Sequence, residues 1–94
     1  MPETPAPLSS RDRAALKARA QALEPALQVG KAGVTDALVA EIEARLDRED
    51  LVKIRLLKSA TEEADRHAVA EDLAARAGAQ LVEVRGNTVV LYRR

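Results

Sequence analysis

Cysteine, phenylalanine and tryptophan are absent from this chain of 94 residues, and Tyr92 is its only aromatic side chain. Without cysteine, the chain can form neither disulfides nor thiolate metal sites. The hydrophobic core must therefore be aliphatic. A single tyrosine also cannot supply the several aromatic rings on which RNA recognition motifs stack bases. Any contact with a nucleic acid would have to depend on phosphate groups and on shape.

Long apolar runs are missing as well. No stretch approaches the roughly 20 apolar residues that a membrane span requires, so we expect no membrane contact. Residues 1–7 contain three prolines and show neither the basic segment nor the apolar segment of a secretory signal. We expect a disordered leader over residues 1–7, one folded domain over residues 8–94, and a cytoplasmic protein.

The spacing of apolar residues predicts three helices and four strands. The first helix follows a Ser9 cap, buries Leu16, Ala20 and Leu23, and ends before Pro25. Gly86-Asn87 is a two-residue hairpin signal between the last two strands. The other expected elements are strands at 26–29, 51–57, 79–85 and 88–93 and helices at 35–50 and 61–78.

This order, α-β-α-β-α-β-β, indicates an α/β fold with a single two-layer domain and a four-stranded mixed sheet. Strand–helix–strand crossovers imply parallel neighbours, whereas a hairpin pair must be antiparallel. Alternation along 51–57 should turn Val52, Ile54 and Leu56 to one side and Lys53, Arg55 and Leu57 to the other. With those three strand residues, the predicted core contains Leu38, Ile42, Leu46, Val69 and Leu73.

Charge is balanced overall but unevenly distributed. The formal net charge is zero. Residues 35–50 contain six acidic side chains and two arginines, and residues 61–78 contain five and two, so these segments carry −4 and −3 and the remainder +7. Acidic side chains that solvate two amphipathic helices would explain the negative part. The basic remainder predicts a positive side of the molecule that could bind an anionic partner.

The segment of most interest is Gly30-Lys31-Ala32-Gly33, between a short strand and a helix capped by Thr35. Two glycines allow a tight turn and close approach of a ligand, and the helix N-terminus favours phosphate. An ordinary strand-to-helix turn with a solubilising lysine explains the segment equally well. A phosphate-binding Walker loop is excluded because Val34, and not Lys-Ser or Lys-Thr, follows the second glycine.

Other basic residues could extend such a site. Arg13 and Lys17 lie one turn apart on the first helix, Lys53 and Arg55 share one side of a strand, and the final hairpin contributes Arg85, Arg93 and Arg94. Each alone is an ordinary surface charge. The single histidine, His67, has no companions at metal-ligand spacing, and no nucleophile–base pair is evident. We therefore predict no catalytic residue, no metal, no cofactor and no enzymatic activity.

Three segments resemble a known family. Gly30-Lys31-Ala32-Gly33 followed by Val34-Thr35, then Leu51-Val52-Lys53-Ile54, and finally the closing run from Gly86 to Arg93 are similar to the CRM domain, named for chloroplast RNA splicing and ribosome maturation. The resemblance covers residues 8–94, as in the stand-alone bacterial YhbY-like proteins. It implies an RNA-binding domain with a fold similar to the C-terminal domain of translation initiation factor 3.

The resemblance also implies a target and a site. Bacterial members associate with precursors of the large ribosomal subunit, so the implied partners are ribosomal RNA and ribosomal precursor particles, with this protein acting as a monomer. The family pattern places Gly30, Lys31 and Gly33, with Ala32 between them, at the RNA, and Lys53 and Arg93 match its basic positions. The chain departs from the pattern at Gln21, where histidine is usual, and at Glu49-Asp50, where His-Glu is common.

One alternative from a different functional class stays open. The acidic helices could dock a basic protein partner, with no RNA contact at all. Phosphate-driven RNA binding weakens steeply with salt because condensed counterions are released, whereas a hydrophobic protein contact changes far less. The salt dependence of binding therefore distinguishes the two hypotheses.

Overall fold

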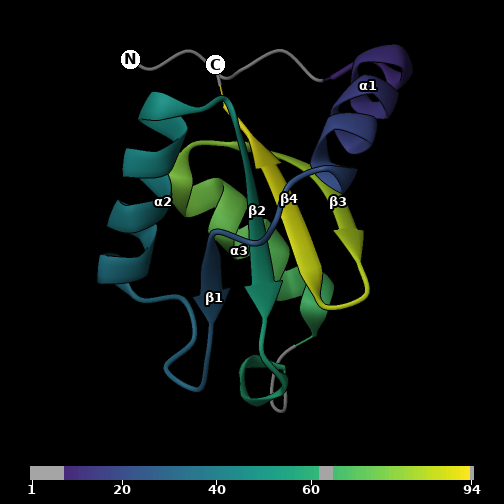
Figure 1. Cartoon of the computed structure of the whole chain (residues 1–94). Coiled ribbons are helices and arrows are strands. Elements are labelled where there is room, and N and C mark those ends of the chain that lie inside the picture. Colours follow the sequence, from purple (N-terminus) through teal and green to yellow (C-terminus); the bar gives the residue numbers. More distant parts are fainter. Residues whose placement is uncertain (1–7, 62–64, 94) are drawn as a thin grey trace.

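The computed structural model describes residues 8–61 and 65–93, so the leader expected at 1–7 lies outside the described residues. The helices are α1 (Ser10–Gln21), α2 (Asp36–Arg48) and α3 (Arg66–Ala77), and a short 3-10 helix, η1, spans Lys58–Ala60. The strands are β1 (Leu27–Val29), β2 (Leu51–Leu56), β3 (Gln80–Arg85) and β4 (Thr88–Tyr92). The predicted order of elements is confirmed (Figure 1).

The four strands form one mixed sheet in the order β1-β2-β4-β3. The α2 crossover makes β1 parallel to β2, while β4 pairs antiparallel with both β2 and β3. Gly86 has φ of 56° in the turn between β3 and β4, a conformation that glycine adopts without strain. The predicted α/β class and the mixed sheet are therefore confirmed.

The main core lies between the sheet and the pair α2 and α3. Val52, Ile54 and Leu56 are buried on this side, so the predicted register of β2 is confirmed. Ile42, Leu46, Val69 and Leu73 are buried against them, also as predicted. Leu38 differs from the prediction because it lies in the first turn of α2 and is only half-buried.

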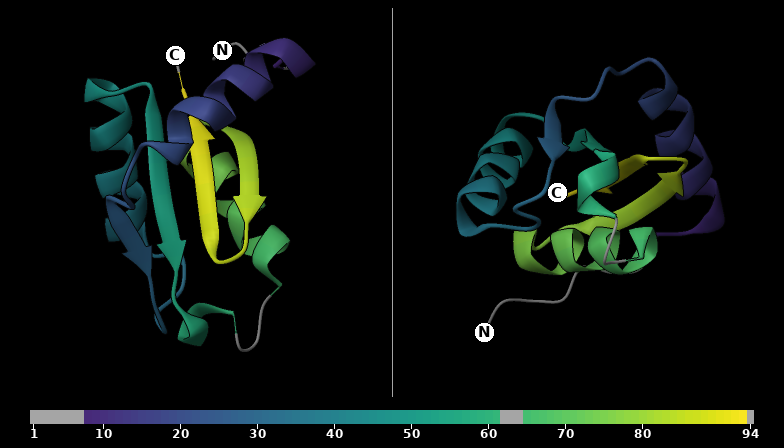
Figure 2. Two further views of the ribbon diagram at one scale, coloured as in Figure 1. Left: turned by 45° about the vertical axis from the view of Figure 1, so that its right-hand side comes forward. Right: turned by 90° about the horizontal axis from the view of Figure 1, so that it is seen from below.

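Helix α1 packs on the opposite side of the sheet. Its buried residues Leu16 and Ala20 form a second, smaller cluster with Leu51, Val82 and Val90. The two predicted layers are thus the sheet and the α2/α3 pair, and α1 adds a partial third layer. Figure 2 (left) shows α1 lying over the upper ends of β4 and β3 only, so no helix covers the lower ends of the strands on this side.

All three helices are shorter than predicted. Helix α1 ends at Gln21, which leaves Leu23 37% exposed beyond the helix and outside the predicted apolar stripe. Within their observed bounds α2 has four acidic side chains and two arginines, a net −2, and α3 has two of each, a net 0. Part of the acidity assigned to the third helix came from Glu62 and Glu63, which lie outside the described residues. The helices themselves are therefore less acidic than the sequence indicated.

Candidate nucleic-acid interface

The uncovered part of the sheet carries polar side chains in register. Gln28 pairs with Arg55, Arg55 with Thr88, and Thr88 with Arg85, so one row crosses all four strands. Residues in register project to the same side of a sheet, and Arg55 alternates with the buried Ile54, so this row lies on the α1 side. Arg55 and Arg85 are exposed at its surface. We call the row Gln28–Arg55–Thr88–Arg85 the open row.

The glycine loop continues directly from the end of β1 beside the open row. The amide of Gly33 donates to the carbonyl of Gly30 at 2.9 Å, which closes a turn with Lys31 and Ala32 exposed at its tip. Gly33 has φ of 73°, whereas Gly30 has ordinary backbone geometry and lies against Leu57. Only the second glycine is therefore required by the backbone.

The helix N-terminus after this loop is already partly satisfied. The Thr35 hydroxyl accepts a hydrogen bond from the Leu38 amide at 3.1 Å. Asp36 places an exposed carboxylate in the first turn of α2. A carboxylate there complements the positive end of the helix dipole and repels phosphate, so Lys31 is the stronger anion-binding feature of the loop.

Two of the predicted site residues hold α1 against the sheet. Arg13 donates from one guanidinium nitrogen to the carbonyls of Leu81 and Val82, each at 2.7 Å, where β3 contains a bulge. Lys53 Nζ lies 3.3 Å from the carbonyls of Ala20 and Leu23 at the end of α1. Both cations therefore have structural partners, although Lys53 also borders the open part of the sheet.

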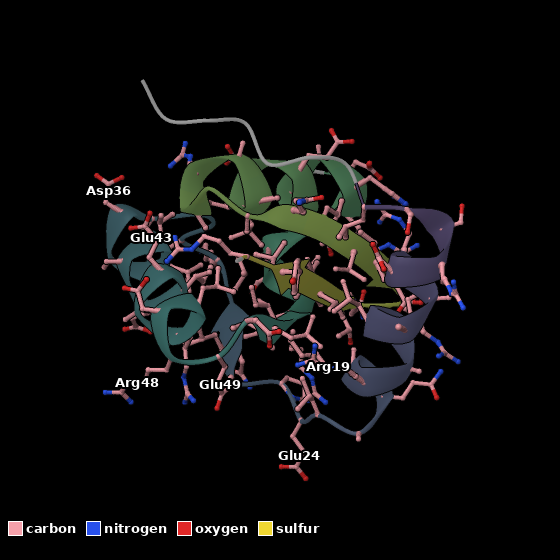
Figure 3. All side chains as sticks on the ribbon, turned by 90° about the horizontal axis from the view of Figure 1, so that it is seen from above. Arg19, Glu24, Asp36, Glu43, Arg48 and Glu49 are labelled. Carbon is pink, nitrogen blue, oxygen red and sulfur yellow. The ribbon has the colours of Figure 1, made fainter. Side chains whose placement is uncertain are left out.

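A surface ion pair closes the other flank of α1. Arg19 donates to both carboxylate oxygens of Asp50, the shorter distance being 2.7 Å, and Figure 3 shows Arg19 between α1 and the turn after α2. This hydrogen bond to Asp50 raises the pKa of the Arg19 guanidinium from its ordinary value. Asp50, one of the departures from the family pattern, thus fixes α1 in this chain.

The structure places Arg93 apart from the other predicted site residues. Its guanidinium donates to the Ala77 carbonyl at 2.9 Å and to the Glu43 carbonyl at 3.2 Å, and it pairs with Asp47 at 2.5 Å. These partners belong to α2 and α3, on the side away from α1. Arg93 therefore links the end of β4 to both core helices, and RNA contact by this residue stays an untested prediction.

Lys17 lies on the β3 flank of α1. Residues four apart share a helix face, so Lys17 lies between Arg13, which reaches β3, and Gln21, which borders the open part of the sheet. The structure thus brings Lys17, Lys53 and Arg55 to one side of the sheet, with the glycine loop at its lower end (Figure 1). Sequence reasoning did not single out Gln28 and Thr88. Only the strand register places them beside Arg55 and Arg85.

The remaining predictions concern metals and membranes. His67 is exposed on α3, with 66% of its side chain accessible. Among residues 8–61 and 65–93, no group of histidine, aspartate and glutamate side chains has the arrangement of a metal site. No helix in the same ranges has the length and apolarity needed to cross a membrane.

Comparison with known proteins identifies the fold family. Residues 8–93 match the CRS1 / YhbY (CRM) domain. YqeI from Bacillus subtilis, whose name is probable RNA-binding protein, is 37% identical over 86 residues, which are 92% of this chain and 88% of that protein. MJ0652 from Methanocaldococcus jannaschii, with the same description, is 33% identical over 92% of this chain and 63% of its own length.

A solved structure agrees with this assignment. The solution structure of the hypothetical protein SAV1595 from Staphylococcus aureus has a TM-score of 0.79 and 26% identity, and the match covers 93% of this chain and 88% of that one. The resemblance first visible in the glycine loop and in the closing segment from Gly86 to Arg93 is therefore confirmed over nearly the whole chain. The protein belongs to the CRS1/YhbY (CRM) domain family.

Proposed function

We propose that this protein is a non-catalytic, cytoplasmic RNA-binding protein that contacts RNA through the open row and the glycine loop. The observation that carries the proposal is the availability of three cations. Lys31, Arg55 and Arg85 are exposed, and none forms a hydrogen bond or ion pair with residues 8–61 or 65–93. By contrast, Arg13, Arg19 and Arg93 are engaged by protein partners. Family membership and the names of the relatives support the same function.

We propose further that the target is ribosomal RNA in precursors of the large ribosomal subunit, bound by a monomer that assists assembly. This finer proposal depends on the resemblance to the stand-alone bacterial members. Sedimentation of native lysate on a sucrose gradient tests it. The protein should migrate with large-subunit precursors and return to the top of the gradient after ribonuclease treatment. Migration at the top without ribonuclease would contradict the ribosomal target.

The alternative, a protein-interaction module, has less support. It depended on two strongly acidic helices, but α2 and α3 carry only −2 and 0 within their observed bounds. Binding to a protein partner that persists in high salt, together with no RNA affinity at low salt, would favour this alternative.

Replacing Lys31 with glutamate is expected to weaken RNA binding about fivefold at low salt, the effect of losing roughly 1 kcal/mol from one exposed charge contact. The slope of log affinity against log salt should fall by about one unit, because one phosphate contact is lost. Fluorescence anisotropy with a labelled ribosomal RNA fragment measures both quantities. The free energy of unfolding should stay unchanged, because Lys31 is exposed.

The two glycines of the loop provide a matched pair of variants. Gly33→Val forces a β-branched residue to φ of 73° and should weaken binding at every salt concentration, because the turn that presents Lys31 is distorted. A Cβ at Gly30 would meet Leu57 Cδ1 at 3.7 Å, an ordinary contact, so Gly30→Ala should leave the fold intact. If Lys31→Glu and Gly33→Val both bound RNA like the parent, the loop would be a structural turn only.

A further inference from the structure

A hollow of about 480 Å³ lies where the end of α1 meets the sheet. Ala20 and Val90 line its apolar part, and both are 2% exposed. Its polar part comes from α1 and from three strands, through the side chains of Gln21, Lys53, Glu83, Arg85 and Thr88. The hollow therefore combines a small apolar floor with converging polar groups, which is the usual composition of a small-ligand site.

Most of these polar groups have no partner in the protein. The side chains of Gln21, Glu83, Arg85 and Thr88 form no hydrogen bond or ion pair with the described part of the chain, 8–61 and 65–93. Glu83 is half-buried and is the single carboxylate that lines the hollow, on a side of the sheet where Lys53, Arg55 and Arg85 are positive. A phosphate group only accepts hydrogen bonds, so a carboxylate facing it would be repulsive.

The strand register fixes how the charged groups are arranged. Lys53 and Glu83 both pair with Val90, one from each side. Adjacent strands lie about 4.8 Å apart, so the backbones of β2 and β3 are separated by about 10 Å across β4. A cation and a carboxylate therefore flank Val90 with the width of a planar ring between them, and Arg85 borders the same space two residues along β3.

The ligand that fits this arrangement has two adjacent hydrogen-bond donors beside an acceptor. A carboxylate has two acceptor oxygens and can bind two parallel donors at once. Guanine offers N1–H and its 2-amino group side by side, with O6 as the neighbouring acceptor. Adenine and cytosine place one donor beside an acceptor, and uracil places one donor between two acceptors. Only guanine therefore satisfies Glu83 with both donors and leaves an acceptor for a cationic or amide donor.

We propose that this hollow holds one unpaired guanine of the bound RNA, with the Glu83 carboxylate accepting from N1–H and the 2-amino group. The inference rests on the proposed RNA-binding function and deepens it by naming the base. The guanine ring lies over Val90 and stacks on the guanidinium of Arg85, a plane that can replace an aromatic side chain. Gln21, Lys53 or Thr88 donates to O6. A chain with one tyrosine thereby gains base selectivity without an aromatic platform.

Three RNA hairpins test the proposal. They differ only at one loop base, which is guanine, inosine or adenine, and inosine lacks the 2-amino group. The parent should bind the guanine hairpin about tenfold more tightly than the adenine hairpin, the discrimination typical of a bidentate contact, with inosine between them. Glu83→Gln should abolish this preference and should also tighten binding to the adenine hairpin, because a negative charge is removed.

The control variant is Glu71→Gln, which removes an exposed carboxylate from α3 and causes the same change in net charge. It should keep the preference for guanine. Equal binding of all three hairpins by the parent, or a preference that survives in Glu83→Gln, would overturn the guanine site and leave RNA binding intact. Failure of the parent to bind any of the hairpins or a ribosomal RNA fragment would overturn the proposed function itself.

Discussion

Replacing Arg55 and Arg85 together with glutamate is expected to weaken RNA binding about a hundredfold at low salt, roughly 2.7 kcal/mol. Both side chains belong to the open row, on either side of Thr88. Their reversal removes two phosphate contacts and adds two repulsive charges. The salt slope should fall by about two units, one for each lost contact. Anisotropy titrations of a ribosomal RNA fragment across a range of salt concentrations measure both effects.

The control is the double variant Arg45→Glu and Arg48→Glu. These arginines are exposed on α2, a helix that packs on the other side of the sheet, and the change in net charge is identical. If net charge alone controlled binding, the two double variants would lose affinity equally. We expect the α2 variant to lose only a few-fold, because exposed charges more than a Debye length from the RNA, about 8 Å at physiological salt, are largely screened.

Replacing Arg93 with alanine is expected to lower the free energy of unfolding by about 2–3 kcal/mol. The substitution removes the donor to the Ala77 and Glu43 carbonyls and the partner of Asp47. Leaving a buried or part-buried polar group unsatisfied costs about 1–3 kcal/mol. Urea denaturation followed by circular dichroism measures the change. Arg11→Ala, which removes an exposed charge from α1, should change stability by less than about 0.5 kcal/mol.

The same variant tests the role that the family pattern implies for Arg93. At a temperature where the protein remains folded, Arg93→Ala should bind RNA like the parent, because its guanidinium faces α2 and α3. A loss of RNA affinity without a loss of stability would show that Arg93 contacts RNA directly, and the interface would then have to extend around the end of β4.

Much of the fold could be predicted because the decisive signals are local. Alternation placed Val52, Ile54 and Leu56 in the core, and Gly86-Asn87 marked the final hairpin. The side of the sheet that α1 covers could not be predicted in this way. Its few buried residues, Leu16 and Ala20, would suit either side, and the choice depends on long-range contacts such as Arg13 to β3 and Arg19 to Asp50.

The site was predictable only in part for the same reason. The glycine loop is a continuous motif, so Lys31 and Gly33 could be found from spacing alone. Whether an arginine is available for a ligand depends on its partners, and those are distant in sequence. Arg93 reaches Glu43, 50 residues away, and Arg13 reaches Leu81, 68 residues away. Glu83 was not singled out because its importance appears only when the register places it opposite Lys53 across β4.

The contact of Arg13 with β3 also has a consequence for self-association. An unpaired outer strand offers its amides and carbonyls to any other extended chain, and proteins commonly block such strands against edge-to-edge aggregation. β3 is one outer strand of the sheet, and its bulge and the guanidinium of Arg13 occupy the same short stretch. The other outer strand, β1, is only three residues long. Arg13 therefore acts as a guard against strand addition, which lets a small, mostly aliphatic domain stay dispersed at the high concentrations of a crowded cell.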